Sequence, residues 1–200
     1  MIDDFGPKVA SVWNDLRSST RNLLERAWRS ATNDSTSQVV GSLQYDPRAD
    51  NELSRLLVAL DARANEGEKS VANESSRRLR KLADACATIL ANQTQSAEVF
   101  SQLIQRAHER KDYARVDELA GLLPQRLAPS EICELARSNN VVVRALAHEA
   151  LTQMPARLLA ALLRDPIDSG VAEIALQRQA GEYLSEEAQR ILREYEDSGL

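Results

Sequence analysis

The sequence is poor in the residue types on which most catalytic sites depend. Of its 200 residues only two are histidines and two are cysteines, and aromatic residues make up 4%. Its seven glycines stand apart from one another, so no glycine-rich loop is present to hold a phosphate. Serine nucleophile motifs are also missing. We therefore expect a protein that is not an enzyme and that carries no cofactor.

The two cysteines, Cys86 and Cys133, each lie in an apolar helical pattern. Their spacing gives no support to a disulfide. Free cysteine is among the residue types most often buried in protein interiors. The pattern therefore favours two buried, reduced thiols.

Long hydrophobic runs are absent as well. No stretch approaches the ~20 apolar residues that a membrane-spanning helix needs. Residues 1–4 include two aspartates where a secretory signal would be basic, and no apolar run follows them. We therefore predict a cytoplasmic protein without a transmembrane segment.

The chain also lacks an excess of basic charge. Its formal net charge is −5, distributed as about +1 over residues 1–31, −1 over 32–95 and −5 over 96–200. An acidic surface does not attract a polyanion along its length. Nucleic acid is therefore an unlikely partner, although the run Arg77-Arg78-Leu79-Arg80-Lys81 leaves that alternative open.

Residues that favour helices are abundant, chiefly Ala, Leu, Arg, Glu and Gln. Apolar residues recur at steps of three and four along most of the chain, and strand patterns are almost absent. We therefore predict an all-α protein. Its expected parts are an N-terminal amphipathic helix within residues 1–31 (helical over 5–31), a polar linker over 32–50, a helical hairpin over 51–92 and short helix pairs over 96–196.

Short breaks separate the expected helices of the second half. Ser96 and Ser185 are suited to cap helices. Turns are predicted at Lys111-Asp112, Asn139-Asn140 and Asp165-Pro166, with a further break between Pro124 and Pro129. Helices of about 9–14 residues joined by such short turns pack as antiparallel neighbours.

An internal repeat runs through this second half. Leu135, Val143, Leu146 and Ala147 recur 28 residues later as Leu163, Val171, Ile174 and Ala175. A fixed offset of this size is typical of stacked helix pairs, none of which can bury its apolar face alone. We therefore predict an α-solenoid built from antiparallel helix pairs.

The segment LARSNNVVVRALAHEAL, residues 135–151, resembles a HEAT-type repeat, and residues 163–176 repeat it in weaker form. The resemblance implies that Asn140 and Arg144 bond between adjacent repeats and keep the stack in register. In the second copy Asp168 occupies the turn and Ala172 replaces the arginine. The resemblance extends over roughly residues 96–196. It also extends to uncharacterised bacterial helical-repeat proteins, which implies nothing about function.

No metal site is predicted. His108 and His148 both occur as Ala-His-Glu, but neither has a second metal ligand four residues later. The many glutamates are expected to lie on solvated helix faces with partners one turn away. The histidines are expected to lie at or near the surface.

The repeat favours a non-catalytic protein-interaction or scaffold module with an unknown protein partner. Its binding groove would be formed by the second helix of each pair. The residues expected there are Arg144, His148 and Gln177, with Arg137, Asn139 and Asn140 at the rim.

Two other hypotheses remain open. One is nucleic-acid binding through the basic run at residues 77–81. The other is homo-oligomerisation through residues 5–31, where Trp13 and Trp28 would contact a partner or another copy. Alternatively, these tryptophans pack on the rest of the chain.

Overall fold

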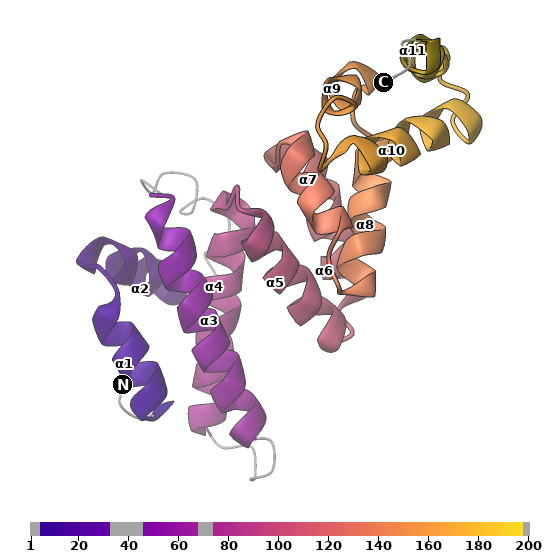
Figure 1. The fold of residues 1–200 in the computed structure, drawn as a ribbon. Coiled ribbons are helices and arrows are strands. Elements are labelled where there is room, and N and C mark those ends of the chain that lie inside the picture. Colours follow the sequence, from indigo (N-terminus) through magenta and orange to yellow (C-terminus); the bar gives the residue numbers. More distant parts are fainter. Residues whose placement is uncertain (1–4, 33–45, 68–73, 198–200) are drawn as a thin grey trace. The chain divides into compact units, whose positions relative to one another are not determined.

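The computed structural model describes residues 5–32, 46–67 and 74–197, and the regular secondary structure in these parts is α-helical (Figure 1). The all-α prediction is therefore confirmed. The chain divides into two compact units, Met1–Thr94 and Gln95–Leu200. Within the described residues, no helix is both long and apolar enough to cross a membrane.

Unit 1 contains α1 (Pro7–Asp15), α2 (Ser18–Thr32), α3 (Arg48–Gly67) and α4 (Glu74–Gln93). Helices α3 and α4 form an antiparallel hairpin, because the start of α3 meets the end of α4: the Thr94 hydroxyl, just beyond α4, donates to the Asp50 carboxylate over 3.0 Å. Helix α1 packs on α3, and α2 packs mainly on α4. The predicted hairpin is thus present, with three additional residues at the start of its first helix.

The single helix predicted over residues 5–31 is wrong, because the chain breaks between α1 and α2. Leu16 takes an extended conformation (φ −67°, ψ 141°) and is only 3% exposed. The break lets Leu16 enter the core while Arg17 turns toward α3. The flanking pairs Asn14-Asp15 and Ser18-Ser19, which are weak helix formers, were the available sequence signal.

Both helices bury their apolar residues inside unit 1. Phe5, Val9, Leu16, Leu23 and Leu24 are all at most 7% exposed. These buried apolar residues of α1 and α2, through which homo-oligomerisation was hypothesised, therefore pack against α3 and α4. Trp13 and Trp28 are partly exposed, on α1 and α2 respectively.

A polar cluster joins the break to α3. The Arg17 guanidinium donates to the Glu52 carboxylate over 2.7 Å and also to Asp46, and the Thr20 hydroxyl donates to Glu52. Burial opposes ionisation of Glu52, but the hydrogen bonds from Thr20 and Arg17 outweigh it and lower the pKa of the carboxyl. The hydrogen bond from Arg17 likewise lowers the pKa of Asp46. Residues 33–45 of the predicted linker lie outside the described residues.

Unit 2 contains seven described helices that alternate between two rows. One row is α5 (Ala97–Glu109), α7 (Pro129–Ala136), α9 (Ala156–Leu162) and α11 (Glu186–Asp197); the other is α6 (Tyr113–Arg126), α8 (Val141–Thr152) and α10 (Ser169–Gly181). Successive members of each row are in contact, and each helix also packs on at least one of its neighbours in the chain. This arrangement of neighbouring pairs is compatible with a helical repeat.

The N-caps of the second row mark the period of the repeat. Asp112, Asn140 and Asp168 precede α6, α8 and α10 at intervals of 28 residues. Asp112 accepts from the backbone N–H of Arg115, and Asn140 accepts from those of Val142 and Val143. The predicted caps Ser96 and Ser185 are also confirmed, with their hydroxyls accepting from Val99 and Ala188.

Other details of unit 2 differ from the prediction. Helix α6 continues through Pro124 to Arg126, so no break begins at Pro124. A proline so close to the end of a helix removes only one donor from the last turn. Three large side chains of these helices are exposed although they follow the apolar spacing of helices: Tyr113 at 60%, Leu158 at 41% and Ile174, one of the repeat positions, at 48%.

Cys86 and Cys133 are both buried and neither forms a disulfide, as predicted. Burial raises the pKa of the Cys133 thiol to about 11, with a smaller contribution from the nearby Asp168 carboxylate. The thiol is therefore protonated at neutral pH and behaves as a small apolar side chain.

We predict that Glu52→Gln lowers the free energy of unfolding of unit 1 by about 1–3 kcal/mol at neutral pH, because hydrogen bonds to a charged group are lost. The folded-state pKa of Glu52 is depressed, so its contribution is complete above about pH 4.5 and disappears as pH falls through the folded pKa. The variant should therefore lose less stability on acidification. Both tryptophans of the chain lie in unit 1, so tryptophan fluorescence during urea unfolding follows this unit.

Glu25→Gln is the matched control for this measurement. Glu25 pairs with Arg29 on the exposed surface of α2 over 3.4 Å, and such pairs contribute at most ~0.5 kcal/mol. Equal destabilisation by the two substitutions would contradict the role assigned to Glu52.

Candidate interaction surface

Helices α8 and α10 are held side by side at both ends. At their N-terminal ends, the Arg137 guanidinium donates to the Asp168 carboxylate over 2.6 Å and to the carbonyl oxygen of Ile167 over 3.3 Å. At their C-terminal ends, Arg178 donates to Glu149 over 3.3 Å. The two helices therefore present their outer faces on the same side of unit 2.

A buried glutamine completes the C-terminal junction. The Gln179 side chain is 5% exposed, and its amide lies 2.7 Å from the carbonyl oxygen of Met154 and 3.0 Å from that of Thr152. These carbonyls lie at and just beyond the end of α8, where the helix leaves acceptors without internal partners. Gln179 could not be identified from the sequence, because the helical pattern does not show which groups a polar side chain at a core position bonds to.

The hydrogen bonds between repeats are not the ones that the resemblance implied. The Asn140 side chain caps its own helix, and Arg144 donates to the carbonyl oxygen of Ser138, in the turn before α8, over 2.8 Å. The side-chain oxygen of Asn140 already accepts hydrogen bonds from two backbone N–H groups at the start of α8, so it does not serve as an acceptor for the neighbouring helix pair. Arg137 supplies the link instead, and Asp168 receives it.

The outer faces of α8 and α10 carry an unusual set of side chains. In their first halves and in the turn before α10, eight apolar residues or glycines are exposed or partly exposed: Val141, Val142, Ala145, Leu146, Ile167, Gly170, Val171 and Ile174. Val141 is 66% exposed, Ile167 is 70% exposed and Ile174 is 48% exposed. We call these eight residues the apolar face. The corresponding outer face of α6 exposes Asp117 and Glu118.

Both helices are therefore apolar on two opposite sides. Val143 and Ala147 of α8 are fully buried, as are Ala172 and Leu176 of α10. The contacts within unit 2 cover only the inner sides, and exposed apolar patches of this kind commonly mark interaction sites.

Charged side chains border the apolar face. Arg144 and His148 lie on α8, and Arg178 on α10 is close enough to act on the same histidine. Burial lowers the pKa of His148, and the positive charges of Arg178 and Arg144 lower it further. His148 is therefore neutral at neutral pH.

The structure brings together some of the predicted groove residues. Arg144, His148 and Gln177 lie on α8 and α10, the second helices of their pairs, and Gln177 is exposed and donates to Glu173 over 2.9 Å. Arg137 and Asn140 lie at the turn before α8 with structural bonds, and Asn139 is exposed there. Trp13 and Trp28 belong to unit 1 and are not part of this surface.

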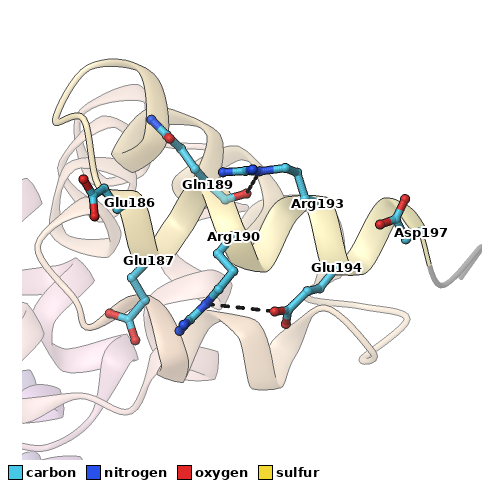
Figure 2. A pocket seen from close by; sticks show the side chains of 7 residues that line it. All are labelled: Glu186, Glu187, Gln189, Arg190, Arg193, Glu194 and Asp197. Carbon is cyan, nitrogen blue, oxygen red and sulfur yellow. Dashed lines mark hydrogen bonds and ion pairs between the residues drawn. The ribbon is translucent and has the colours of Figure 1, made fainter.

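A second, different surface lies on the outer side of α11 (Figure 2). A shallow hollow there is lined only by polar residues: Glu186, Glu187, Gln189, Arg190, Arg193, Glu194 and Asp197. Two of its contacts lie within the helix, Arg190 to Glu194 at 3.9 Å and the Arg193 guanidinium to the Gln189 carbonyl at 3.3 Å. The inner side of α11 buries Ala188 and partly buries Ile191 and Leu192. Helix α11 thus packs on α9 and α10 and turns a polar side outward.

Within the part of the chain that the structure describes, no group of three or more His, Cys, Asp or Glu side chains could hold a metal ion. His108 is exposed, and its ring lies edge-on to Tyr113 with centroids 6.3 Å apart. Comparisons with protein-family models, with curated proteins and with solved structures found no match to this chain.

We predict that Gln179→Leu destabilises unit 2 by about 1–3 kcal/mol, because buried carbonyl oxygens at the end of α8 lose their donor. The measurement is urea unfolding followed by far-UV circular dichroism. Gln177→Leu, two residues away and exposed, should change stability by at most ~0.5 kcal/mol. The tryptophan fluorescence transition, which follows unit 1, should not move in either variant. A neutral Gln179→Leu would show that water can replace the glutamine amide.

Proposed function

We propose that this chain is a non-catalytic protein-interaction module whose contact surface is the apolar face of α8 and α10. The observation that carries the proposal is the exposure of Val141 on α8, Ile174 on α10 and Ile167 in the turn before α10, each at least 48% exposed, although both helices already bury their inner sides. A partner that buried one of these side chains completely would gain up to roughly 1.5–3 kcal/mol of binding free energy from it.

The surroundings of the apolar face fit this role. Arg137, Asp168 and Gln179 fix α8 and α10 against each other, so the face is preorganised for binding. Arg144, His148 and Gln177 border it with groups that can hydrogen-bond to a partner. An apolar centre with a polar rim is the usual anatomy of a protein–protein interface.

Nucleic-acid binding is a second candidate, favoured by one observation. Arg77, Arg78, Arg80 and Lys81 are all exposed in the first half of α4. However, Arg78 pairs with Glu74 over 3.2 Å, and Asp84 is exposed on the same helix. The basic run is therefore short and partly neutralised.

We predict that Ile174→Lys abolishes binding to the physiological protein partner, because it places a charge in the centre of the apolar face. The measurement is affinity capture from a lysate of the producing cells, with quantitative comparison of the proteins retained. Val58→Lys is the matched control, since Val58 is 57% exposed but lies on α3 in unit 1. If both variants retain the same proteins as the unmodified chain, the surface has been misassigned.

For the second candidate, we expect no binding of duplex DNA at ~50 mM salt, a concentration at which phosphate contacts are strong. A fluorescence anisotropy titration measures this directly. Binding that weakens steeply with added salt and is lost in Arg77→Glu/Arg80→Glu would instead favour a nucleic-acid function.

A further inference from the structure

We propose that α1 is an exchangeable arm: the chain straightens at Leu16 and Arg17, and α1 of one copy then packs on α3 of a second copy, giving a domain-swapped dimer. The contacts between the copies are those that α1 makes within one chain, so the exposed surface and its occupant already match. The inference concerns unit 1 and does not depend on the function proposed for unit 2.

The hinge of this exchange is short and contains no helix-breaking residue. Only Leu16 and Arg17 separate α1 from α2, and neither glycine nor proline occurs between Pro7 and Thr32. Short hinges of this kind favour the exchange of an element between copies. At about 100° per residue, an uninterrupted helix would place six residues of this segment within an arc of about 100°. All six are at most 7% exposed in the bent form: Phe5, Val9, Leu16, Thr20, Leu23 and Leu24.

A continuous helix would also give helical partners to backbone groups at the hinge. In an α-helix each N–H donates to the carbonyl four residues earlier. The N–H groups of residues 18–20 would therefore donate to the carbonyls of residues 14–16. In the bent form these N–H groups begin α2 and have no partner within it, and the Leu16 carbonyl accepts from the Arg21 guanidinium over 3.0 Å.

Polar contacts with the start of α3 and the segment before it hold the bent form. The Arg17 guanidinium donates to Glu52 over 2.7 Å and also to Asp46. Its Nη2 atom is buried and has no hydrogen-bond partner among the described residues, so the guanidinium is incompletely satisfied. Arg17 therefore carries the contacts that the chain would lose on straightening, and it carries them at a cost.

Helix α1 is attached to unit 1 chiefly through α3, along which it runs antiparallel. Near one end, the Phe5 carbonyl accepts from Arg63 over 3.2 Å. Near the other end, Asp15 pairs with Arg55 at 3.8 Å. Helix α2 contacts mainly α4, and α1 and α2 point in different directions (Figure 1). Straightening with α2 held on α4 therefore takes α1 off its own α3, and reciprocal exchange covers both surfaces again.

The test begins with sedimentation velocity of the full chain at increasing concentration. We expect Arg17→Gln to raise the association constant of the dimer at least ~10-fold, because the monomer loses charged hydrogen bonds that the straight form does not make. Glutamine and arginine are similar helix formers, so the hinge itself is little changed. Arg29→Gln is the control, since Arg29 pairs with Glu25 on the exposed surface of α2 and should leave the constant unchanged.

A proline at the hinge should block the exchange. Ser18 is the first residue of α2, a position at which proline is tolerated, so Ser18→Pro retains the bent monomer. In a continuous helix the same proline would lie in the interior and lower the association constant at least ~100-fold. Ser18→Ala is the control at the same site and should not lower it. Circular dichroism and tryptophan fluorescence during urea unfolding establish that unit 1 of each variant is folded.

Cross-linking identifies the exchanged arm. In the Arg17→Gln background, a chain with Asp15→Cys is mixed with a chain with Arg55→Cys, and a short bis-maleimide is added. Exchange brings these two positions together between copies, so a covalent heterodimer is expected. The native Cys86 and Cys133 are buried and do not compete for the reagent.

Three results would overturn the proposal: an Arg17→Gln chain that stays monomeric at all concentrations, a dimer that persists in Ser18→Pro, and a dimer that gives no cross-link. Ile174→Lys, on α10, should leave the exchange unchanged. A dimer lost in that variant would lie on unit 2 and would also contradict the exchange of α1. Failure of the exchange leaves the function proposed for α8 and α10 standing.

Discussion

Unit 2 depends on a constraint common to short helix pairs: none of them buries enough apolar surface alone, so each must be fixed to the next. Between the pairs α7–α8 and α9–α10 this fixing is polar and occurs at both ends of the second-row helices. Arg137 reaches Asp168 at one end, and Gln179 supplies donors to the carbonyls of Thr152 and Met154 at the other. Apolar packing between the two ends brings the helices together but does not define their relative height. The hydrogen bonds at the two ends fix the height of α8 relative to α10.

Much of this architecture could be predicted from the sequence because it is encoded locally. A cap residue such as Asp112 or Asn140 acts on N–H groups two or three residues away, so its role is visible without knowledge of the fold. The interval of 28 residues between such caps then reveals the repeat. The fold class and most helix boundaries of unit 2 follow from these local rules.

The remaining features depend on contacts between distant residues. The helix breaks at Leu16 because Arg17 and Thr20 donate hydrogen bonds to Glu52 on α3, more than thirty residues away in the sequence. Arg137 and Asp168 are 31 residues apart and show no pairing signal in the sequence. On α8 and α10 the difficulty is different: these helices are apolar on both sides, so periodicity cannot decide which side is buried. Ile174 thus holds an apolar position of the repeat and is nevertheless exposed.

The polar outer side of α11 has a consequence for how such a chain could change in length. A further pair appended beyond α11 would have to desolvate the carboxylates of Glu186, Glu187 and Glu194, and this would cost more than the added apolar contact returns. An extra pair inserted between existing members would instead meet apolar neighbours on both sides. We therefore expect helix pairs of unit 2 to be gained or lost more readily between existing pairs than on the outer side of α11.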